Sequence, residues 1–325
     1  MPAAVALAAF AVSLAVLLVL LRRFGHVALD RPNERSLHER PVPRTGGLAI
    51  LSGAAVSLAF GAAQLALPLA IAALFAALSF LDDVHGVRTV VRLTFHLTGA
   101  AVFAWYVLSP MGVIELALLV LAVAWLTNLY NFMDGSDGLA GGMTVLGFGC
   151  YALAGWWAGE TAIAALCAAI ASAAAAFLIY NFHPARIFLG DVGSIPLGFL
   201  ASAIGIVGWR NDAWPLWFPV LVFGPFIGDA TLTLVKRAIR GQRVWRAHRE
   251  HYYQRMIRMG FGHRATALIA YAIMAACAGA ALFGREQDGA TQALVFGGMI
   301  LVLGAVAAWV DLRWARTYRG GGASA

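Results

Sequence analysis

The side chains best suited to chemistry lie in a short polar turn, residues 128–140, that follows an apolar run. It reads Asn-Leu-Tyr-Asn-Phe-Met-Asp-Gly-Ser-Asp-Gly-Leu-Ala, so Asp134 and Asp137 stand close to Asn128 and Asn131. Carboxylate and amide oxygens gathered in a small volume suit hard cations such as Mg²⁺ and the phosphates that these cations carry. One aspartate would be enough to cap the next helix, so this composition favours a binding site over a simple cap.

A second acidic group, Asp82 and Asp83, ends another apolar segment. Adjacent carboxylates repel each other unless a cation or a proton lies between them, and such pairs often form metal sites or share a proton. The alternative is a solvated acid pair at the membrane edge, balanced by Arg88 and Arg92. The glycine and histidine that follow the pair indicate a close turn.

A third acid, Asp191, stands in the turn Phe188-Leu-Gly-Asp-Val-Gly-Ser, where the next apolar segment begins. Small residues at a helix N-terminus leave backbone N–H groups exposed, which favours a phosphate or a carboxylate. Asp191 could equally be a simple N-cap. Phe188 could stack on a nucleobase, or it could be an interfacial aromatic residue.

The loop 236–264 is strongly basic and contains Arg246, His248, Arg249 and His251. Two histidines among arginines can clamp a diphosphate, since Arg binds phosphate through two N–H groups. If the segment is helical, the two histidines and the two arginines project from neighbouring faces. The alternative is a basic run that binds anionic lipid headgroups and sets topology.

The composition shows what must position these residues. Apolar residues make up 61% of the chain and charged residues 12%, and the mean hydropathy is +0.79, outside the range of soluble globular proteins. With roughly 20 residues per span, we expect an all-α polytopic membrane protein with a single domain over residues 1–325. Eleven spans are expected, or ten if the second and third are one: about 3–21, 46–63, 65–81, 93–109, 112–127, 140–158, 161–180, 193–209, 214–235, 265–283 and 292–310.

The first span is expected to be retained, because its basic residues follow the apolar run, whereas in a signal peptide they precede it. All three cysteines fall within expected spans and are interpreted as buried thiols.

The basic residues predict the orientation. With the N-terminus outside, 21 of the 23 Lys and Arg lie on one face, and only Arg210 and Arg285 lie on the other. The positive-inside rule makes the basic face and the C-terminus cytoplasmic. The segments of this face are the loops 22–45, 82–92, 128–139, 181–192 and 236–264 and the tail from residue 311. All the acidic clusters therefore lie on the cytoplasmic side.

Taken together and in order, these motifs resemble the polyprenyl-phosphate N-acetylhexosamine-1-phosphate transferases, glycosyltransferase family 4. The matching pieces, over residues 30–255, are Arg35-Ser-x-His38 with Pro-x-Pro and Gly46-Gly47, Leu81-Asp82-Asp83-x-x-Gly86, the 128–140 turn, Phe188-Leu-Gly-Asp191-x-Gly-Ser and His248-Arg-x-His251. The span count and the last motif favour the glycan-initiating branch. The related phospho-MurNAc-pentapeptide translocases typically carry three consecutive histidines there, and this chain does not.

The resemblance implies that N-acetylhexosamine-1-phosphate passes from a UDP-sugar to undecaprenyl phosphate in the bacterial inner membrane, releasing UMP and starting O-antigen or a related cell-envelope glycan. It implies Mg²⁺, with Mn²⁺ as an alternative, and membrane lipids as surroundings; no nucleic-acid partner is expected. The oligomeric state is left open, with a homodimer compatible. The implied catalytic positions are Asp82, Asp83, Asp134, Asp137 and His248; the substrate-binding positions Asn128, Phe188, Arg246, Arg249, His251 and Arg44; and the metal positions Asn131 and Asp191.

Within this scheme Asp82 would deprotonate or position the lipid phosphate, with Asp83 beside it, while Asp134 and Asp137 would contact the nucleoside and Phe188 the uracil. The separate roles of Asp82 and Asp83 stay open. It also stays open whether the lipid phosphate attacks the donor directly or the reaction passes through a covalent enzyme intermediate. Three other functions remain as alternatives: the peptidoglycan translocase, an ion-coupled transporter and a lipid-binding scaffold. A transporter is expected to place charges in the middle of its spans, and here only Asp229 lies inside an expected span.

Overall fold

The computed structural model describes residues 2–30, 41–108, 112–246 and 248–319, and it is all-α apart from a short ladder. In that ladder β1 (Leu29–Asp30) pairs antiparallel with β2 (Val42–Pro43). The long helices are α1 (Pro2–Arg23), α3 (Ala66–His85), α4 (Thr89–Leu108), α5 (Val113–Phe132), α6 (Leu139–Trp157), α7 (Thr161–Asn181), α8 (Asp191–Arg210), α12 (Gly262–Gly284) and α13 (Gly289–Arg319). The shorter ones are α2 (Gly46–Ala55), η1 (Val56–Phe60), η2 (Ala63–Leu65), α9 (Trp217–Val222), α10 (Gly224–Ile239), α11 (Tyr252–Met256) and η3 (Ile257–Phe261).

Within the described residues, nine helices are long and apolar enough to cross a membrane, and two further expected spans look different. The helical stretch Gly46–Phe60 is shorter. It measures roughly 25 Å, against a hydrocarbon core of about 30 Å. The segment expected at 214–235 is divided into α9 and α10, and Pro225 stands in the first turn of α10, where its missing N–H disturbs no helical bond. The polytopic all-α class is confirmed.

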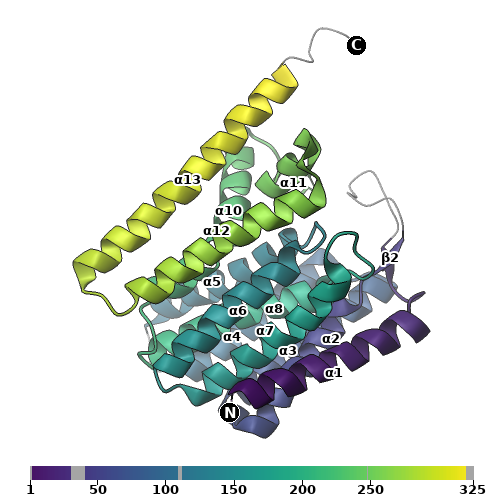
Figure 1. Ribbon diagram of the computed structural model, residues 1–325, viewed down its shortest axis with the longest axis vertical. Coiled ribbons are helices and arrows are strands. Elements are labelled where there is room, and N and C mark those ends of the chain that lie inside the picture. Colours follow the sequence, from purple (N-terminus) through teal and green to yellow (C-terminus); the bar gives the residue numbers. More distant parts are fainter. Residues whose placement is uncertain (1, 31–40, 109–111, 247, 320–325) are drawn as a thin grey trace.

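The core is centred on α8 and the helices around it. In α8, 89% of the apolar window is buried by protein, against 6% in α13, which lies along the outside of the bundle (Figure 1). Glycines let the central helices approach each other: a Cβ on Gly47 of α2 would lie 2.2 Å from the Cα of Gly193 in α8. The three cysteine thiols are free and buried, as expected.

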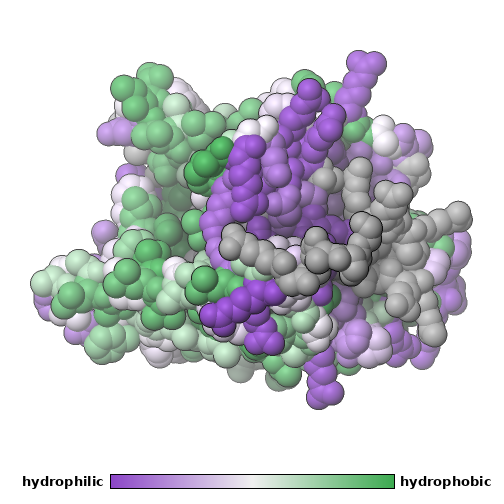
Figure 2. Space-filling model, turned by 90° about the horizontal axis from the view of Figure 1, so that it is seen from above, coloured by the Kyte–Doolittle hydropathy of each residue, from purple (hydrophilic) through white to green (hydrophobic). Residues whose placement is uncertain are grey.

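The polar residues gather at one end of the bundle. Viewed from the end at which α13 finishes, the molecule shows a hydrophilic region beside apolar helix surface (Figure 2). The ends of α3, α5 and α10 and the beginnings of α8 and α11 carry the acidic and basic motifs. The fold thus brings to one place motifs that are more than a hundred residues apart in the sequence.

Candidate active site

Four predicted aspartates form one acidic cluster at this end of the bundle. Asp82 and Asp83 lie in the last turn of α3, Asp134 follows α5, and Asp191 is the first residue of α8. Asp83 lies within electrostatic range of Asp191 and Asp82, and Asp134 within range of Asp191. Asp30 of β1 adds a fifth carboxylate near both Asp83 and Asp134. Like charges gathered at this density need cations or protons between them.

Two arginines supply part of the positive charge. Arg92 Nη1 lies 2.5 Å from Asp82 Oδ2 and 3.7 Å from Asp191 Oδ2, so it bridges α3 and α8. Arg44 Nη1 lies 3.5 Å from Asp83 Oδ1. Arg44 was predicted as a substrate-binding residue, and here it lies beside the cluster. Arg92 was expected only as a counter-charge at the membrane edge; its contact with Asp191 depends on how α4 packs and has no sequence signal.

The two members of the acid pair have different environments. Asp82 Oδ1 accepts the Val87 N–H at 2.6 Å, and its other oxygen meets Arg92, so both oxygens have partners. The Asp83 side chain is 5% exposed, and its Oδ2 is buried without a hydrogen-bond partner. A buried unsatisfied acceptor requires a proton, an ion or a water. Asp83 is therefore the member of the pair that is open to a ligand, whereas the sequence favoured Asp82 for contact with the lipid phosphate.

Burial has a clear electrostatic effect on Asp134. Desolvation raises the pKa of Asp134 well above its usual range, and the nearby Asp191 carboxylate raises it further, while a hydrogen bond from the Gly190 backbone opposes the shift. A raised pKa favours the protonated carboxyl over the carboxylate, and a nearby cation would favour the carboxylate. The turn that carries Asp134 is held from below by Asn181, whose side chain accepts the Gly138 N–H and donates to the Ile187 carbonyl.

The donor set suits a hard divalent cation. Asn131 is hydrogen-bonded to Asp191, and Asp191 lies within electrostatic range of Asp134. These groups offer only oxygen ligands, the type that Mg²⁺ and Mn²⁺ prefer. The unsatisfied Asp83 Oδ2 adds an acceptor nearby. Among the described residues, however, no three His, Cys, Asp or Glu side chains are already close enough to hold a metal. The residues fit such an ion, and the carboxylates would have to draw together around it.

Asp137 lies apart from the contacts of the acidic cluster, although only two residues separate it from Asp134. Its Oδ2 lies 2.7 Å from His183 Nδ1 and accepts the Ala185 N–H at 3.1 Å, and its Oδ1 lies 4.0 Å from His263 Nδ1. The two imidazole rings are stacked, 5.3 Å apart. The sequence analysis singled out neither histidine, because neither belongs to a motif.

The basic segment is not a continuous helix. Residues 241–246 and 248–250 form turns and irregular structure, and α11 begins at Tyr252, so the helix on which the pairing of Arg246 with Arg249 and of His248 with His251 depended is not formed. His248 and His251 are nevertheless neighbours, with ring centroids 4.8 Å apart. Burial, together with His251, lowers the pKa of His248 to about 4, so it is a neutral imidazole at pH 7.

The first-loop and Phe188 motifs are joined by backbone hydrogen bonds. Phe188 donates its N–H to the Pro43 carbonyl at 2.8 Å and accepts the Gly46 N–H at 3.0 Å, and Gly47 donates to Leu189 at 3.0 Å. Gly47 thus serves close packing against α8, and Gly46 serves close packing against Phe177 of α7 and the Phe188 carbonyl. Residues 35, 36 and 38 of the same motif lie outside the described residues.

Asn128 and Arg246 were both predicted to bind substrate. Arg246 is exposed, whereas the Asn128 side chain makes contacts with neighbouring helical residues. Its Nδ2 donates to the Ala124 carbonyl at 2.7 Å, and its side chain also meets His96 of α4. The carbonyl of Arg249, a third such residue, accepts a hydrogen bond from Arg258. For these residues substrate binding stays a prediction.

Comparison with known proteins identifies the family of the chain. The family model "Glycosyl transferase family 4" matches residues 65–209. A probable undecaprenyl-phosphate N-acetylglucosaminyl 1-phosphate transferase of Bacillus subtilis is 30% identical over 289 residues, which cover 82% of this chain and 81% of that protein. A decaprenyl-phosphate N-acetylglucosaminephosphotransferase of Mycobacterium tuberculosis is 30% identical over 336 residues (87% and 82%). A phospho-N-acetylmuramoyl-pentapeptide-transferase of Halalkalibacterium halodurans is 27% identical over 266 residues (71% and 80%). The chain belongs to glycosyl transferase family 4, the polyprenyl-phosphate N-acetylhexosamine-1-phosphate transferases.

Proposed function

We propose that this protein transfers N-acetylhexosamine-1-phosphate from a UDP-sugar to undecaprenyl phosphate, giving undecaprenyl diphosphate-sugar and UMP. One observation carries the proposal: aspartates from three separate helix ends, with Asn131, converge at one end of a polytopic membrane bundle. Substrates that are both phosphate anions, one of them anchored in lipid, need a cation-binding centre at the membrane surface. The relatives named for polyprenyl-phosphate N-acetylglucosamine phosphate transfer support this chemistry.

The residues have distinct roles in this proposal. Asn131 and Asp191, with Asp134 beside them, would hold Mg²⁺, which when bound neutralises phosphate charge and polarises the bond to the leaving group. Asp83 has an unsatisfied oxygen and would meet the lipid phosphate, while Asp82 holds Arg92 in place. Arg44 and Arg92 are within reach of the same acids and would balance the added phosphate charge. Phe188 would lie against the uracil.

The proposed orientation follows from the basic residues: N-terminus outside, C-terminus cytoplasmic, in a bacterial inner membrane. The cytoplasmic side is where nucleotide sugars are made, so the acidic cluster would meet its donor there. Reporter fusions after Arg285 and after Arg316, at the two ends of α13, should report opposite compartments. The same compartment for both would reject this topology.

The activity is tested with purified full-length protein, undecaprenyl phosphate, Mg²⁺ and a panel of UDP-N-acetyl sugars. We expect UMP release with at least one sugar, together with a matching lipid diphosphate-sugar detected by mass spectrometry. Chelation of the metal should stop both. UMP release without the lipid product would indicate donor hydrolysis, and absence of both products with every sugar would reject the proposal. Extending the panel to UDP-MurNAc-pentapeptide separates the glycan-initiating role from the peptidoglycan role.

A further inference from the structure

A largely buried acid, Asp229 of α10, contacts the basic motif directly. Its side chain is 9% exposed. Asp229 Oδ1 accepts the backbone N–H of Tyr252 at 2.9 Å and lies 3.1 Å from His251 Nδ1, while Oδ2 accepts the Tyr253 N–H at 3.0 Å. Three contacts from consecutive residues therefore meet on one carboxylate. Acids inside a membrane protein are expensive, and a specific partner is the usual reason that they are kept.

The carboxylate also determines which nitrogen of His251 carries a proton. An ionised carboxylate can only accept hydrogen bonds, so Nδ1 must be the donor, and Nε2 is left to face other groups. The ring is 4% exposed and stacks on Tyr253 (5.9 Å, 16°) and on Phe132 (6.3 Å, 27°). Its orientation is thus fixed by one hydrogen bond and two aromatic faces.

This arrangement connects His251 to the acidic cluster. Tyr253 donates its hydroxyl to the Phe132 carbonyl at 3.2 Å, and it lies within electrostatic range of both Asp229 and Asp134. A Cβ on Gly135 would lie 2.2 Å from the Tyr253 hydroxyl, so α11 is in close contact with the turn that carries Asp134. Moving His251 or α11 would therefore also disturb the turn after α5.

The surroundings make the Asp229–His251 contact strong. Asp229, Tyr252 and Tyr253 line one side of a cavity of about 420 Å³, and the rest of its lining is almost entirely apolar side chains of α9, α10, α12 and α13. Hydrogen bonds to a charged group are stronger in such low-dielectric surroundings, and a carboxylate that loses its partners there is costly. The fold therefore strongly favours the state in which the Asp229 carboxylate is hydrogen-bonded to His251, Tyr252 and Tyr253.

We infer that Asp229 is a positioning residue for the transferase reaction: it holds the His251 imidazole with its proton on Nδ1, so that His251 meets the substrate through Nε2. The inference rests on the proposed function. In this role Nε2 of His251 accepts a hydrogen bond from a substrate N–H or O–H at a fixed angle, in place of the flexible cationic clamp suggested by the sequence. Asp229 itself touches no substrate.

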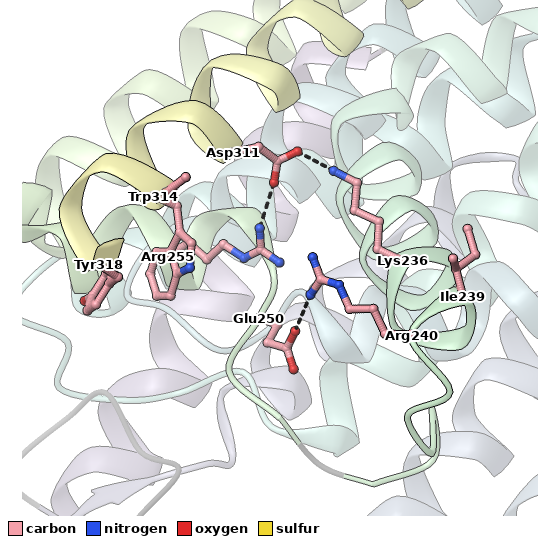
Figure 3. A pocket seen from close by; sticks show the side chains of 9 residues that line it. Lys236, Ile239, Arg240, Glu250, Arg255, Asp311, Trp314 and Tyr318 are labelled. Carbon is pink, nitrogen blue, oxygen red and sulfur yellow. Dashed lines mark hydrogen bonds and ion pairs between the residues drawn. The ribbon is translucent and has the colours of Figure 1, made fainter. Parts of the chain in front are cut away.

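A second acid near α11 provides a matched control. Asp311 of α13 lies 2.8 Å from Arg255 Nη1 and also pairs with Lys236 (Figure 3). The described hydrogen bonds and ion pairs of Asp311 do not include His251. It therefore tests whether loss of any carboxylate beside α11 is enough to impair the enzyme. Asp229→Asn keeps the shape of its side chain, but the amide Nδ2 cannot accept the N–H that an Asp oxygen accepts.

The experiment compares wild type, Asp229→Asn, His251→Ala, the double variant and Asp311→Asn as purified full-length proteins. We expect Asp229→Asn to lower kcat at least about tenfold, with the KM for the UDP-sugar changed less than about threefold. The double variant should be no slower than His251→Ala alone, because Asp229 acts through His251. Histidine ¹⁵N NMR should show Nδ1–H at His251 in wild type and in Asp311→Asn, and an altered tautomer in Asp229→Asn.

Several results would overturn the inference while the proposed function stands: a kcat within twofold of wild type in Asp229→Asn or in His251→Ala, or a double variant that loses the product of the two single losses. The conservative Asp229→Glu should restore part of the activity if it restores the Nδ1–H signal. If wild type releases no UMP with any donor, the proposed function fails, and the NMR comparison alone decides whether Asp229 fixes the tautomer.

Discussion

The acidic cluster and the basic segment lie at the same end of the molecule, but they are held in different ways. The acids stand at the ends of α3, α5 and α8, and α8 is the most buried long helix described. The basic segment is a run of turns and a five-residue helix, held by Asp229 and Asp311 from neighbouring helices. Packed helix ends tolerate the loss of one polar contact, whereas a short segment held by a few polar contacts does not.

This difference predicts which property each substitution should change. Substitutions in the acidic cluster should abolish the transfer reaction and leave the fold intact, because the packing of the helix backbones sets the geometry of the cluster. Substitution of Asp229 should loosen the orientation of the His251 ring. The following predictions test this division, from the largest expected effect to the smallest.

The largest effect is expected at Asp83. Asp83→Asn should lower UMP release by about a thousandfold, roughly 4 kcal/mol, because it removes the charge of the carboxylate whose Oδ2 has no protein partner. Thermal unfolding should change little. Asp82→Asn is the matched comparison and should lose activity mainly by releasing Arg92. A larger loss at Asp82 than at Asp83 would return the contact with the lipid phosphate to Asp82.

A packing prediction concerns the contact of α2 with α8. Gly47→Ala should destabilise the protein by roughly 1–3 kcal/mol, because its Cβ would lie 2.2 Å from Gly193 Cα and 2.4 Å from Gly193 N, both backbone atoms. Displacement of the start of α8 should also weaken activity through Asp191. Gly149→Ala in α6, where nothing lies within 4 Å, is the control and should unfold at or above the wild-type temperature.

A pH prediction follows from Asp134. Its pKa is raised in the folded state, so the folded protein holds this proton at pH values where the unfolded chain has lost it. Stability supported by the protonated carboxyl is therefore full below the ordinary Asp pKa and falls as the pH rises above it. In the absence of metal, Asp134→Asn should raise the unfolding temperature at pH 7–8 by roughly 2–4 °C, and the gain should vanish near pH 4. An equal gain at every pH would contradict the ionisation argument.

A smaller effect on turnover than at Asp83 is expected at His248. His248→Ala should lower turnover by about tenfold, roughly 1.4 kcal/mol, by removing the ring beside His251. Because burial lowers the pKa of His248 to about 4, this residue does not titrate between pH 6 and 8. His248→Gln should therefore leave the shape of the pH–rate profile unchanged over that range. Loss of an ionisation from the profile would show that His248 is charged in the working enzyme. Arg240→Ala should cost less than either variant.

Local patterns in the sequence predicted much of this protein. Its composition was enough to place it in the membrane as an all-α chain, because backbone groups in lipid must be satisfied within helices. The expected topology placed Asp82, Asp83, Asp134 and Asp191 on one face of the membrane, and the resemblance to the family implied that they belong to one site. Two expected spans, 46–63 and 214–235, do not form single long helices. Each has a glycine or proline near a break, and hydropathy does not report backbone geometry there.

What only the tertiary structure decided concerns partners that are distant in sequence. The sequence alone does not distinguish Asp82 from Asp83. They differ in the structure because Arg92 and the Val87 N–H bind both carboxylate oxygens of Asp82 but neither oxygen of Asp83. Asp134 and Asp137 belong to one motif, but the turn formed by the two residues between them directs their side chains to different neighbours. Asp229 belongs to no motif, and its contacts with His251, Tyr252 and Tyr253 come from the packing of α10 against α11. Hydrogen-bond satisfaction and burial depend on atoms brought together from distant positions, and no local pattern contains that information.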